Sequence, residues 1–277
     1  MPIGSNKMVF GFPAHFIKLN CILLLVDIVK VSGNTVLITG GATGIGLALA
    51  EKLLGLGNEV IICGRRAAKL EEARIKLPHL HTRRCDISKE NEREELFKWV
   101  ESNFKNFNVL VNNAGIQKRI DLRKGREDLS GAEDEIEINL RSQIHLSALF
   151  IPLLSKRKEA AIINISSGLG FVPMASFPVY SATKAAIHSF TISLRHQLKS
   201  TPIKVFEVVP PAVHDTELKG RPVQKTEYSI SAWEMAGAIV EGLENERYEI
   251  SAGAAKKWLE ASRRELDEAF SNINRLE

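Results

Sequence analysis

Short runs of apolar and β-branched residues alternate along the chain with longer stretches in which apolar residues recur at helical spacing. The short runs predict buried strands, and the longer stretches predict amphipathic helices between them. The expected strands are 35–39, 59–63, 81–85, 109–112, 161–166 and 204–209. The expected helices are 47–56, a charged helix that passes through 70–75 and ends before Pro78, and 89–104, 136–154 and 180–198.

Strands that are apolar throughout and alternate with helices are typical of a parallel sheet with helices on both faces. Right-handed crossovers make such a sheet a doubly wound, Rossmann-type α/β fold. No linker, repeat or low-complexity tract divides residues 31–277, which therefore predict a single domain. Residues 1–30 lack this periodicity, and we expect a poorly ordered extension that the fold does not need. A weak contact with a membrane surface or a partner is the alternative.

The apolar run 21–26 within this extension is far shorter than the roughly 20 residues that a membrane-spanning helix needs, so we expect no integral membrane segment. The net charge of +4 is spread along the chain without a basic stripe, which argues against a nucleic-acid partner. Cys21, Cys63 and Cys85 show neither metal-ligand spacing nor a disulfide pattern. They predict buried thiols in a reducing, cytoplasmic compartment and no metal site.

A tyrosine and a lysine stand four residues apart, at Tyr180 and Lys184, and therefore lie on one face of a predicted helix. An ammonium group close to a phenol favours the phenolate, so we expect Lys184 to lower the pKa of Tyr180 from its usual value near ~10. A phenol tuned in this way can exchange a proton with an alcohol or a carbonyl. This spacing alone is also common on solvated helix faces.

The sequence TGGATGIG follows the first predicted strand directly and opens the next helix. Glycines let the backbone approach a pyrophosphate closely, and the helix start supplies unpaired N–H groups and the positive end of the helix dipole. A tight turn without a ligand is the alternative, but the position between strand and helix favours a dinucleotide site. The cofactor contacts expected here are Thr39, Gly40, Gly44, Ile45 and Gly46.

Arg65 and Arg66 follow the second strand, where an NAD-binding sheet usually carries an acid for the ribose 2′-hydroxyl. Two guanidinium groups suit a 2′-phosphate instead, so the sequence predicts NADP(H), with NAD(H) as the alternative. A solvated helix start would also account for these arginines. Asp86 and Ile87, after the third strand, are placed to meet the adenine. The sequence NNAG after the fourth strand suits a tight turn beside the cofactor, with contacts from Asn112, Ala114 and Gly115.

Over residues 34–216, the chain resembles the short-chain dehydrogenase/reductases of typical length. The resemblance rests on TGGATGIG, NNAG and YSATK in this order, and on a serine thirteen residues before the tyrosine. It implies a catalytic tetrad of Asn139, Ser167, Tyr180 and Lys184, with Ser167 preferred to Ser166 because of that spacing. Ser167 would bind the substrate oxygen, and Tyr180 would exchange the proton. Lys184 would also hold the nicotinamide ribose, and Asn139 would help to hold a water linking Lys184 to solvent.

Two positions after the sixth strand depart from the family pattern. Pro210-Pro211 stands where the family often has Pro-Gly, and Thr216 comes one position later than usual. The resemblance makes Pro210, Val213 and Thr216 candidates for cofactor contact, with Thr216 at the nicotinamide carboxamide. The stretches GNTVLITGGATGIGLALA, NNAGIQ, PPAV and AFSNINR are similar to a bacterial DltE-like subgroup, which implies no substrate.

These features predict an NADP(H)-dependent oxidoreductase that acts on a small carbonyl compound or secondary alcohol. A catalytically silent dinucleotide-binding regulator and an oxidoreductase of cell-envelope metabolism are the alternatives. We expect the substrate to be selected by residues 168–177 and 217–233. The predicted helices 136–154 and 180–198 carry more apolar side chains than one sheet face needs. The resemblance implies pairing of subunits through these two helices, so we expect a homodimer or homotetramer. The residues concerned are Leu146, Leu149, Phe150, Ile187 and Phe190.

Overall fold

A computed structural model describes residues 30–129, 131–218, 225–264 and 272. These residues form one seven-stranded sheet in the order β3-β2-β1-β4-β5-β6-β7, in which every neighbouring pair is parallel. The chain reverses its direction of winding between β1 and β4, and ligands of open α/β sheets bind at such a point. The strands are β1 (Thr35–Thr39), β2 (Glu59–Gly64), β3 (His81–Arg84), β4 (Phe107–Asn112), β5 (Ala160–Ile165), β6 (Ile203–Val209) and β7 (Glu249–Ser251).

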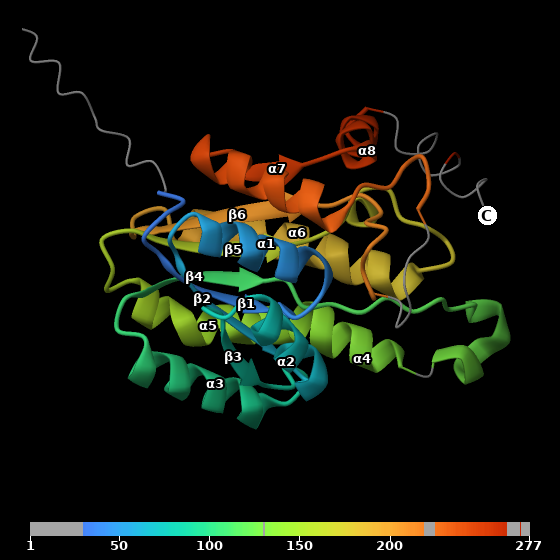
Figure 1. Ribbon diagram of the computed structural model, residues 1–277. Coiled ribbons are helices and arrows are strands. Elements are labelled where there is room, and N and C mark those ends of the chain that lie inside the picture. The colour runs from blue at the N-terminus through green and yellow to red at the C-terminus, as the bar shows by residue number, and fades with distance from the viewer. Residues whose placement is uncertain (1–29, 130, 219–224, 265–271, 273–277) are drawn as a thin grey trace, which may run out of the picture.

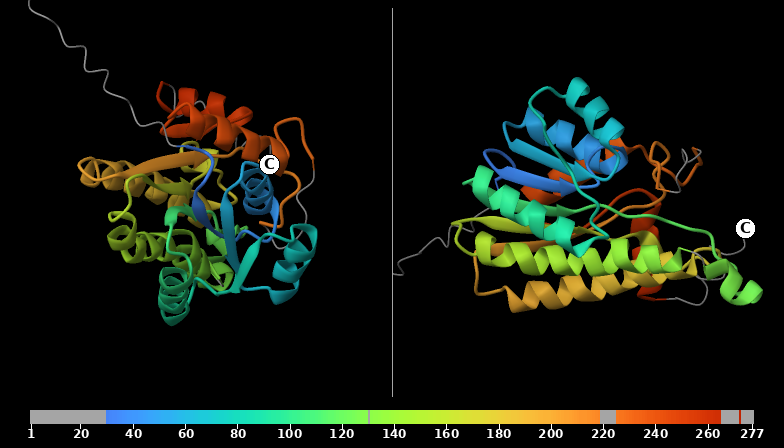
Figure 2. Two further views of the ribbon diagram at one scale, coloured as in Figure 1. Left: turned by 60° about the vertical axis from the view of Figure 1, so that its left-hand side comes forward. Right: turned by 90° about the horizontal axis from the view of Figure 1, so that it is seen from below.

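Helices cover both faces of the sheet (Figure 1). One face packs against α1 (Gly44–Gly55), α2 (Ala67–Lys76) and α7 (Ala232–Glu244). The other packs against α3 (Glu90–Asn103), α5 (Ser142–Leu154) and α6 (Pro178–Gln197). The short α4 (Ala132–Ile136) precedes a π-helical turn at Glu137–Arg141, and α8 (Ala254–Ser262) follows β7. Short 3₁₀ segments lie at Leu122–Leu129 and Gly168–Gly170. Figure 2 shows α5 and α6 side by side on their face.

The alternation of side chains along each strand divides the core into two layers. In β1, Val36 and Ile38 face the α1 layer and Leu37 faces the α5 layer, and all three are buried. Such double-sided burial requires strands that are apolar throughout, which is the pattern seen in the sequence. The Rossmann-type doubly wound fold expected from the sequence is therefore confirmed.

Several elements differ from the sequence expectations. The predicted helix 136–154 is divided into α4, the π-helical turn and α5, and α6 begins at Pro178, since proline suits the first turn of a helix. A seventh strand, β7, was not expected because its three residues are too few to show a period. Among the described residues, no helix is both long and apolar enough to cross a bilayer.

The apolar residues that suggested subunit pairing serve this chain's own core. Leu146, Phe150 and Ile187 are each fully buried, and Leu149 and Phe190 are partly buried against the α5 layer. These five side chains therefore do not supply a free apolar surface, although Ile144 on α5 and Ile192 on α6 are exposed, and the homo-oligomer stays a prediction. Cys63 and Cys85 are buried and form no disulfide. Cys21 and the predicted extension at residues 1–29 lie outside the described residues.

Candidate active site

The glycine-rich loop joins β1 to α1 at the carboxyl edge of the sheet. Gly40 and Gly44 have φ values of +63° and +55°, a region that favours glycine. A Cβ atom on Gly40 would lie 2.8 Å from Ala114 Cα, and one on Gly46 would lie 2.6 Å from Asn113 Nδ2. The loop therefore needs glycine both for its conformation and for its contact with the end of β4. Its geometry provides the close approach to α1 that a pyrophosphate requires.

The end of β4 is tied to the glycine loop by polar contacts. Thr39 Oγ1 accepts hydrogen bonds from the backbone N–H groups of Asn113 and Ala114, at 3.0 and 3.1 Å. Asn113 Nδ2 donates to the Thr39 carbonyl oxygen at 2.8 Å. Thr39 is fully buried, so it shapes the loop rather than lining the cleft. Asn112 is also fully buried and donates to Asn164 and Ser147, which places its side chain inside the protein and Asn113 at the cleft.

Arg65 and Arg66 line one end of the cleft, together with Asp86 and Ile87. Arg66 Nη1 lies 2.5 Å from Glu217 Oε2, an ion pair with no sequence signal because the two residues are 151 positions apart. Asp86 Oδ1 accepts hydrogen bonds from the backbone N–H and the hydroxyl of Ser88.

At the other end of the cleft, the Tyr180 phenol on α6 lies near the hydroxyl of Ser167, which follows β5. Ser167 Oγ also accepts from the backbone N–H of Leu169 at 3.2 Å, which fixes its orientation. The neighbouring Ser166 has a different partner, because its hydroxyl donates to the Val208 carbonyl oxygen at 3.1 Å. The structure therefore brings Ser167, and not Ser166, to the phenol.

Lys184 lies one helical turn after Tyr180 and is almost fully buried. Its Nζ donates to the Ile165 carbonyl oxygen at 2.7 Å and lies 5.7 Å from the centre of the Tyr180 ring. Asn139, in the π-helical turn, accepts from the Ile116 N–H and donates to the Ile116 carbonyl oxygen, both at 2.8 Å. A Cβ atom on Gly115 would lie 3.3 Å from Asn139 Oδ1 and 3.7 Å from Lys184 Nζ, so both side chains lie close to the backbone of Gly115.

The expected lowering of the Tyr180 pKa is not found. Burial raises the pKa of Tyr180 to about 12, and the nearby Ser167 hydroxyl offsets this only in part. Burial also lowers the pKa of Lys184 to about 8, against which the charge of Glu207 acts. The ammonium charge of Lys184 favours the phenolate, but the cost of removing both groups from water outweighs it. The Tyr180 phenol therefore keeps its proton at neutral pH.

Thr216 lies at the glycine loop. A Cβ atom on Gly44 would come 2.9 Å from Thr216 Cγ2, and the Thr216 hydroxyl donates to the Val213 carbonyl oxygen at 3.0 Å. Thr216 lines the cleft, and its contact with the nicotinamide carboxamide stays a prediction. Pro210 and Val213 line the same cleft.

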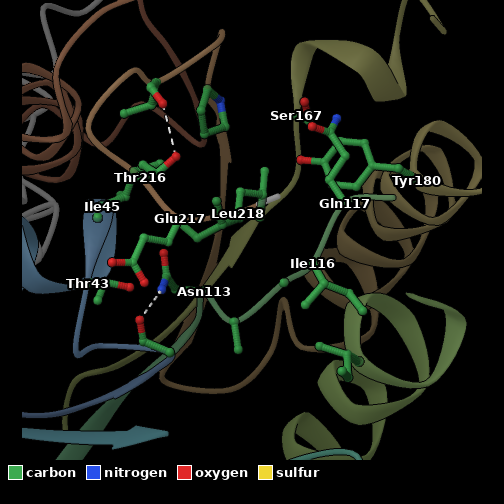
Figure 3. Close-up of a pocket in the computed structure, with 18 of the residues that line it drawn as sticks. Thr43, Ile45, Asn113, Ile116, Gln117, Ser167, Tyr180, Thr216, Glu217 and Leu218 are labelled. Carbon is green, nitrogen blue, oxygen red and sulfur yellow. Dashed lines mark hydrogen bonds between the residues drawn. The ribbon is translucent and has the colours of Figure 1, made fainter. Parts of the chain in front are cut away.

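One cavity of roughly 370 Å³ connects these groups. Figure 3 shows Thr43 and Ile45 on one side of it, Tyr180, Ser167 and Gln117 on the other, and Thr216, Glu217 and Leu218 between them. Leu169, Met174, Phe177, Glu217 and Leu218 also line the cavity and fall in the segments 168–177 and 217–233 that were expected to select the substrate. Thr43, Asn113, Ile116 and Gln117 stand within the quoted motifs but were not named as contacts. Trp258 on α8 was not identified from the sequence, because only the fold brings this helix to the cleft.

A glycine-rich loop at the switch point of a doubly wound sheet, with a buried Ser-Tyr-Lys set across the cleft, defines a dinucleotide-binding oxidoreductase. Residues 34–227 match the family model of the short chain dehydrogenases. The chain belongs to this family and is an enzyme that acts on CH–OH groups with a nicotinamide dinucleotide as acceptor.

An uncharacterized oxidoreductase, DltE of Bacillus subtilis strain 168, is 50% identical over 248 residues, which cover 88% of this chain and 98% of that protein. The NADP-dependent 3-hydroxy acid dehydrogenase YdfG of Escherichia coli O6:H1 is 30% identical and covers 66% of this chain and 73% of its own. A short chain dehydrogenase of Burkholderia cenocepacia, solved in complex with NADP, superposes with a TM-score of 0.77 at 26% identity, covering 88% of this chain and 98% of its own. The DltE-like resemblance of the sequence is confirmed.

Proposed function

We propose that the chain is an NADP(H)-dependent reductase of apolar carbonyl compounds, with Tyr180 as the proton donor. The observation that carries this proposal is that Ser167, Tyr180 and Lys184 line one end of a cleft whose other end carries the arginines. A silent dinucleotide-binding regulator would not need a buried serine, phenol and ammonium at such a place. This arrangement therefore supports an enzyme.

The residues of the cleft fit a nicotinamide dinucleotide. The glycine loop, whose conformation excludes side chains at Gly40 and Gly46, would hold the pyrophosphate at the start of α1. Arg65 and Arg66 would hold a 2′-phosphate, and Lys184 would hold the nicotinamide ribose. When bound, the cofactor supplies or accepts the hydride. The NADP complex of the Burkholderia relative and the NADP-dependent Escherichia relative point to the same cofactor.

The protonation states suit reduction at neutral pH. A phenol with a pKa of about 12 keeps its proton at pH 7 and can deliver it to the oxygen of a carbonyl as negative charge develops there. Ser167 would donate a second hydrogen bond to that oxygen and hold it against the phenol. Lys184, with a pKa of about 8, is mostly charged at pH 7 and stabilises the phenolate that proton transfer leaves behind.

The substrate end of the cleft is mainly apolar. Leu169, Phe177 and Tyr180 form a buried cluster, against which Met174, Leu218 and Trp258 pack. Gln117 is a polar side chain at this end of the cavity. Such a lining favours an aliphatic or aromatic ketone, aldehyde or diketone over a sugar or another highly hydroxylated compound.

Cofactor titration tests the proposal without a known substrate. NADPH and NADH are titrated by fluorescence against the wild type, Arg65→Ala and Arg66→Ala, with Arg74→Ala as the control. Arg74 is an exposed arginine on α2 that is bound to Glu71. Each phosphate contact is worth about 1.5–3 kcal/mol, so we expect NADPH to bind roughly ten- to a hundredfold more tightly than NADH. Equal affinities in the wild type would contradict the NADP(H) preference.

A further inference from the structure

Glu217 places a carboxylate among the cations that a 2′-phosphate would need. Its Oε2 lies 2.5 Å from Arg66 Nη1, and its Oε1 lies 3.8 Å from Lys69 Nζ. The hydrogen bond and charge of Arg66 lower the pKa of the Glu217 carboxyl, so it is ionised at neutral pH. Arg66 also reaches Thr43 Oγ1 at 3.4 Å, at the start of the glycine loop. The guanidinium that would clamp a phosphate is thus already engaged by an anion.

An acidic residue beside the adenosine ribose could instead favour NAD(H), since NAD-binding sheets carry an acid that binds the 2′-hydroxyl. That acid follows the second strand, however, and this chain has Arg65 and Arg66 there. Glu217 reaches the site from the segment after β6, and each of its oxygens faces a cation. A phosphate dianion on Arg66 would repel it. The geometry therefore favours competition with the phosphate over a contact with the ribose hydroxyl.

The segment that carries Glu217 touches both ends of the cleft. The Thr216 methyl group lies over Gly44 of the glycine loop. The Leu218 carbonyl oxygen accepts from the Gln117 N–H at 3.1 Å, and the Leu218 side chain packs against the cluster that contains Tyr180. In Figure 3 these residues cross the cavity in sequence order. Residues 216–218 therefore connect the Arg66 end of the cleft to the wall of the substrate pocket.

We propose that Glu217 is an internal competitor of the cofactor 2′-phosphate. Binding of NADP(H) exchanges the carboxylate for the phosphate on Arg66 and frees residues 216–218 from α2. NAD(H) has no group that displaces the carboxylate and leaves this contact in place. Glu217 is then a determinant of cofactor specificity that lies outside the phosphate-binding motif. The inference rests on the proposed preference for NADP(H).

The test removes the charge of Glu217 and keeps its size. Adenosine 2′,5′-bisphosphate and AMP, which contain only the adenosine half of the cofactor, are titrated by calorimetry against the wild type and Glu217→Gln. Glu72→Gln is the matched control. Glu72 lies on α2 and also binds Lys69, at 2.8 Å, but it forms no ion pair with Arg66. Exposed ion pairs are weak, so we expect Glu217→Gln to bind the bisphosphate about two- to tenfold more tightly. Its AMP affinity, and both affinities of Glu72→Gln, should change less than about twofold.

Two results would overturn the inference. One is bisphosphate affinity that is unchanged or weaker in Glu217→Gln. The other is a selective loss of AMP affinity, which would assign Glu217 to the ribose hydroxyl. Arg66→Ala separates this failure from that of the proposed function. Suppose that the wild type binds the bisphosphate more tightly than AMP and that Arg66→Ala loses this preference. If Glu217→Gln then leaves the bisphosphate affinity unchanged, only the proposed competition fails. If the wild type shows no preference, the proposed NADP(H) specificity fails, and the bisphosphate affinity of Glu217→Gln still decides for or against the competition.

Discussion

Lys184 donates a hydrogen bond to the carbonyl oxygen of Ile165 at 2.7 Å, which anchors the ammonium group to the end of β5 near the Tyr180 phenol. Because Lys184 is almost fully buried, its pKa falls to about 8, close enough to neutrality for its charge to change in ordinary assays. A neutral amine holds ribose hydroxyls less strongly and leaves the phenolate without a counter-charge.

We therefore expect NADPH affinity and reductive turnover to fall as the pH rises through about 8. Tyr180, with a pKa of about 12, stays protonated over this range and does not contribute to the loss. The measurement is the NADPH dissociation constant from pH 6 to about 10. Lys184→Arg should remove the pH dependence, since arginine stays charged, and Lys184→Met should bind weakly at every pH. A wild-type profile that is flat through pH 8 would show that Lys184 does not titrate there.

The pair His188–Glu207 should make stability depend on pH. His188 Nδ1 lies 2.8 Å from Glu207 Oε2, and Glu207 is almost fully buried. The hydrogen bond to Glu207 raises the His188 pKa above 6.5; nearby Glu249 adds to this and Arg263 opposes it. A raised histidine pKa contributes stability that is fully present below the unfolded value and is lost as the pH rises through the folded value.

Thermal unfolding of His188→Asn should accordingly show its largest deficit relative to the wild type near pH 6, and a smaller deficit above pH 8. His81→Asn is the control, because His81 and Glu59 form a half-exposed pair at 3.5 Å. A deficit for His188→Asn that is the same at pH 6 and pH 8 would mean that packing of the ring, and not its charge, carries the effect.

The glycine loop should not tolerate a side chain at Gly40. Its φ of +63° is costly for alanine, and the new Cβ would lie 2.8 Å from Ala114 Cα, which is backbone and cannot move aside cheaply. We expect Gly40→Ala to lower the free energy of unfolding by at least about 1–2 kcal/mol and to weaken NADPH binding. Gly55→Ala is the control, because Gly55 has a helical φ and no atom within 4 Å of its Cβ position. Chemical denaturation of both variants measures the difference, and equal stabilities would contradict the strain argument.

The sheet could be predicted because burial on both faces forces a continuous apolar run in each central strand. The glycine loop and the Tyr180–Lys184 pair could be predicted because their spacing is local. The Arg66–Glu217 ion pair could not, since it joins segments that only the folded chain brings together. The predicted direction of the Tyr180 pKa shift was wrong for a related reason. The shift depends on burial in three dimensions, whereas the sequence displays only the neighbouring charge.

The central claim is that Tyr180 delivers the proton during carbonyl reduction, and the most direct measurement is turnover of Tyr180→Phe. A panel of small ketones, aldehydes and diketones first identifies a compound that the wild type reduces with NADPH. The variant loses only a hydroxyl, so its fold and its NADPH affinity should remain, whereas turnover should fall by about 10² to 10⁴ or more. Near-wild-type turnover by a folded, NADPH-binding Tyr180→Phe would show that the proton comes from another group and would contradict this account of the site.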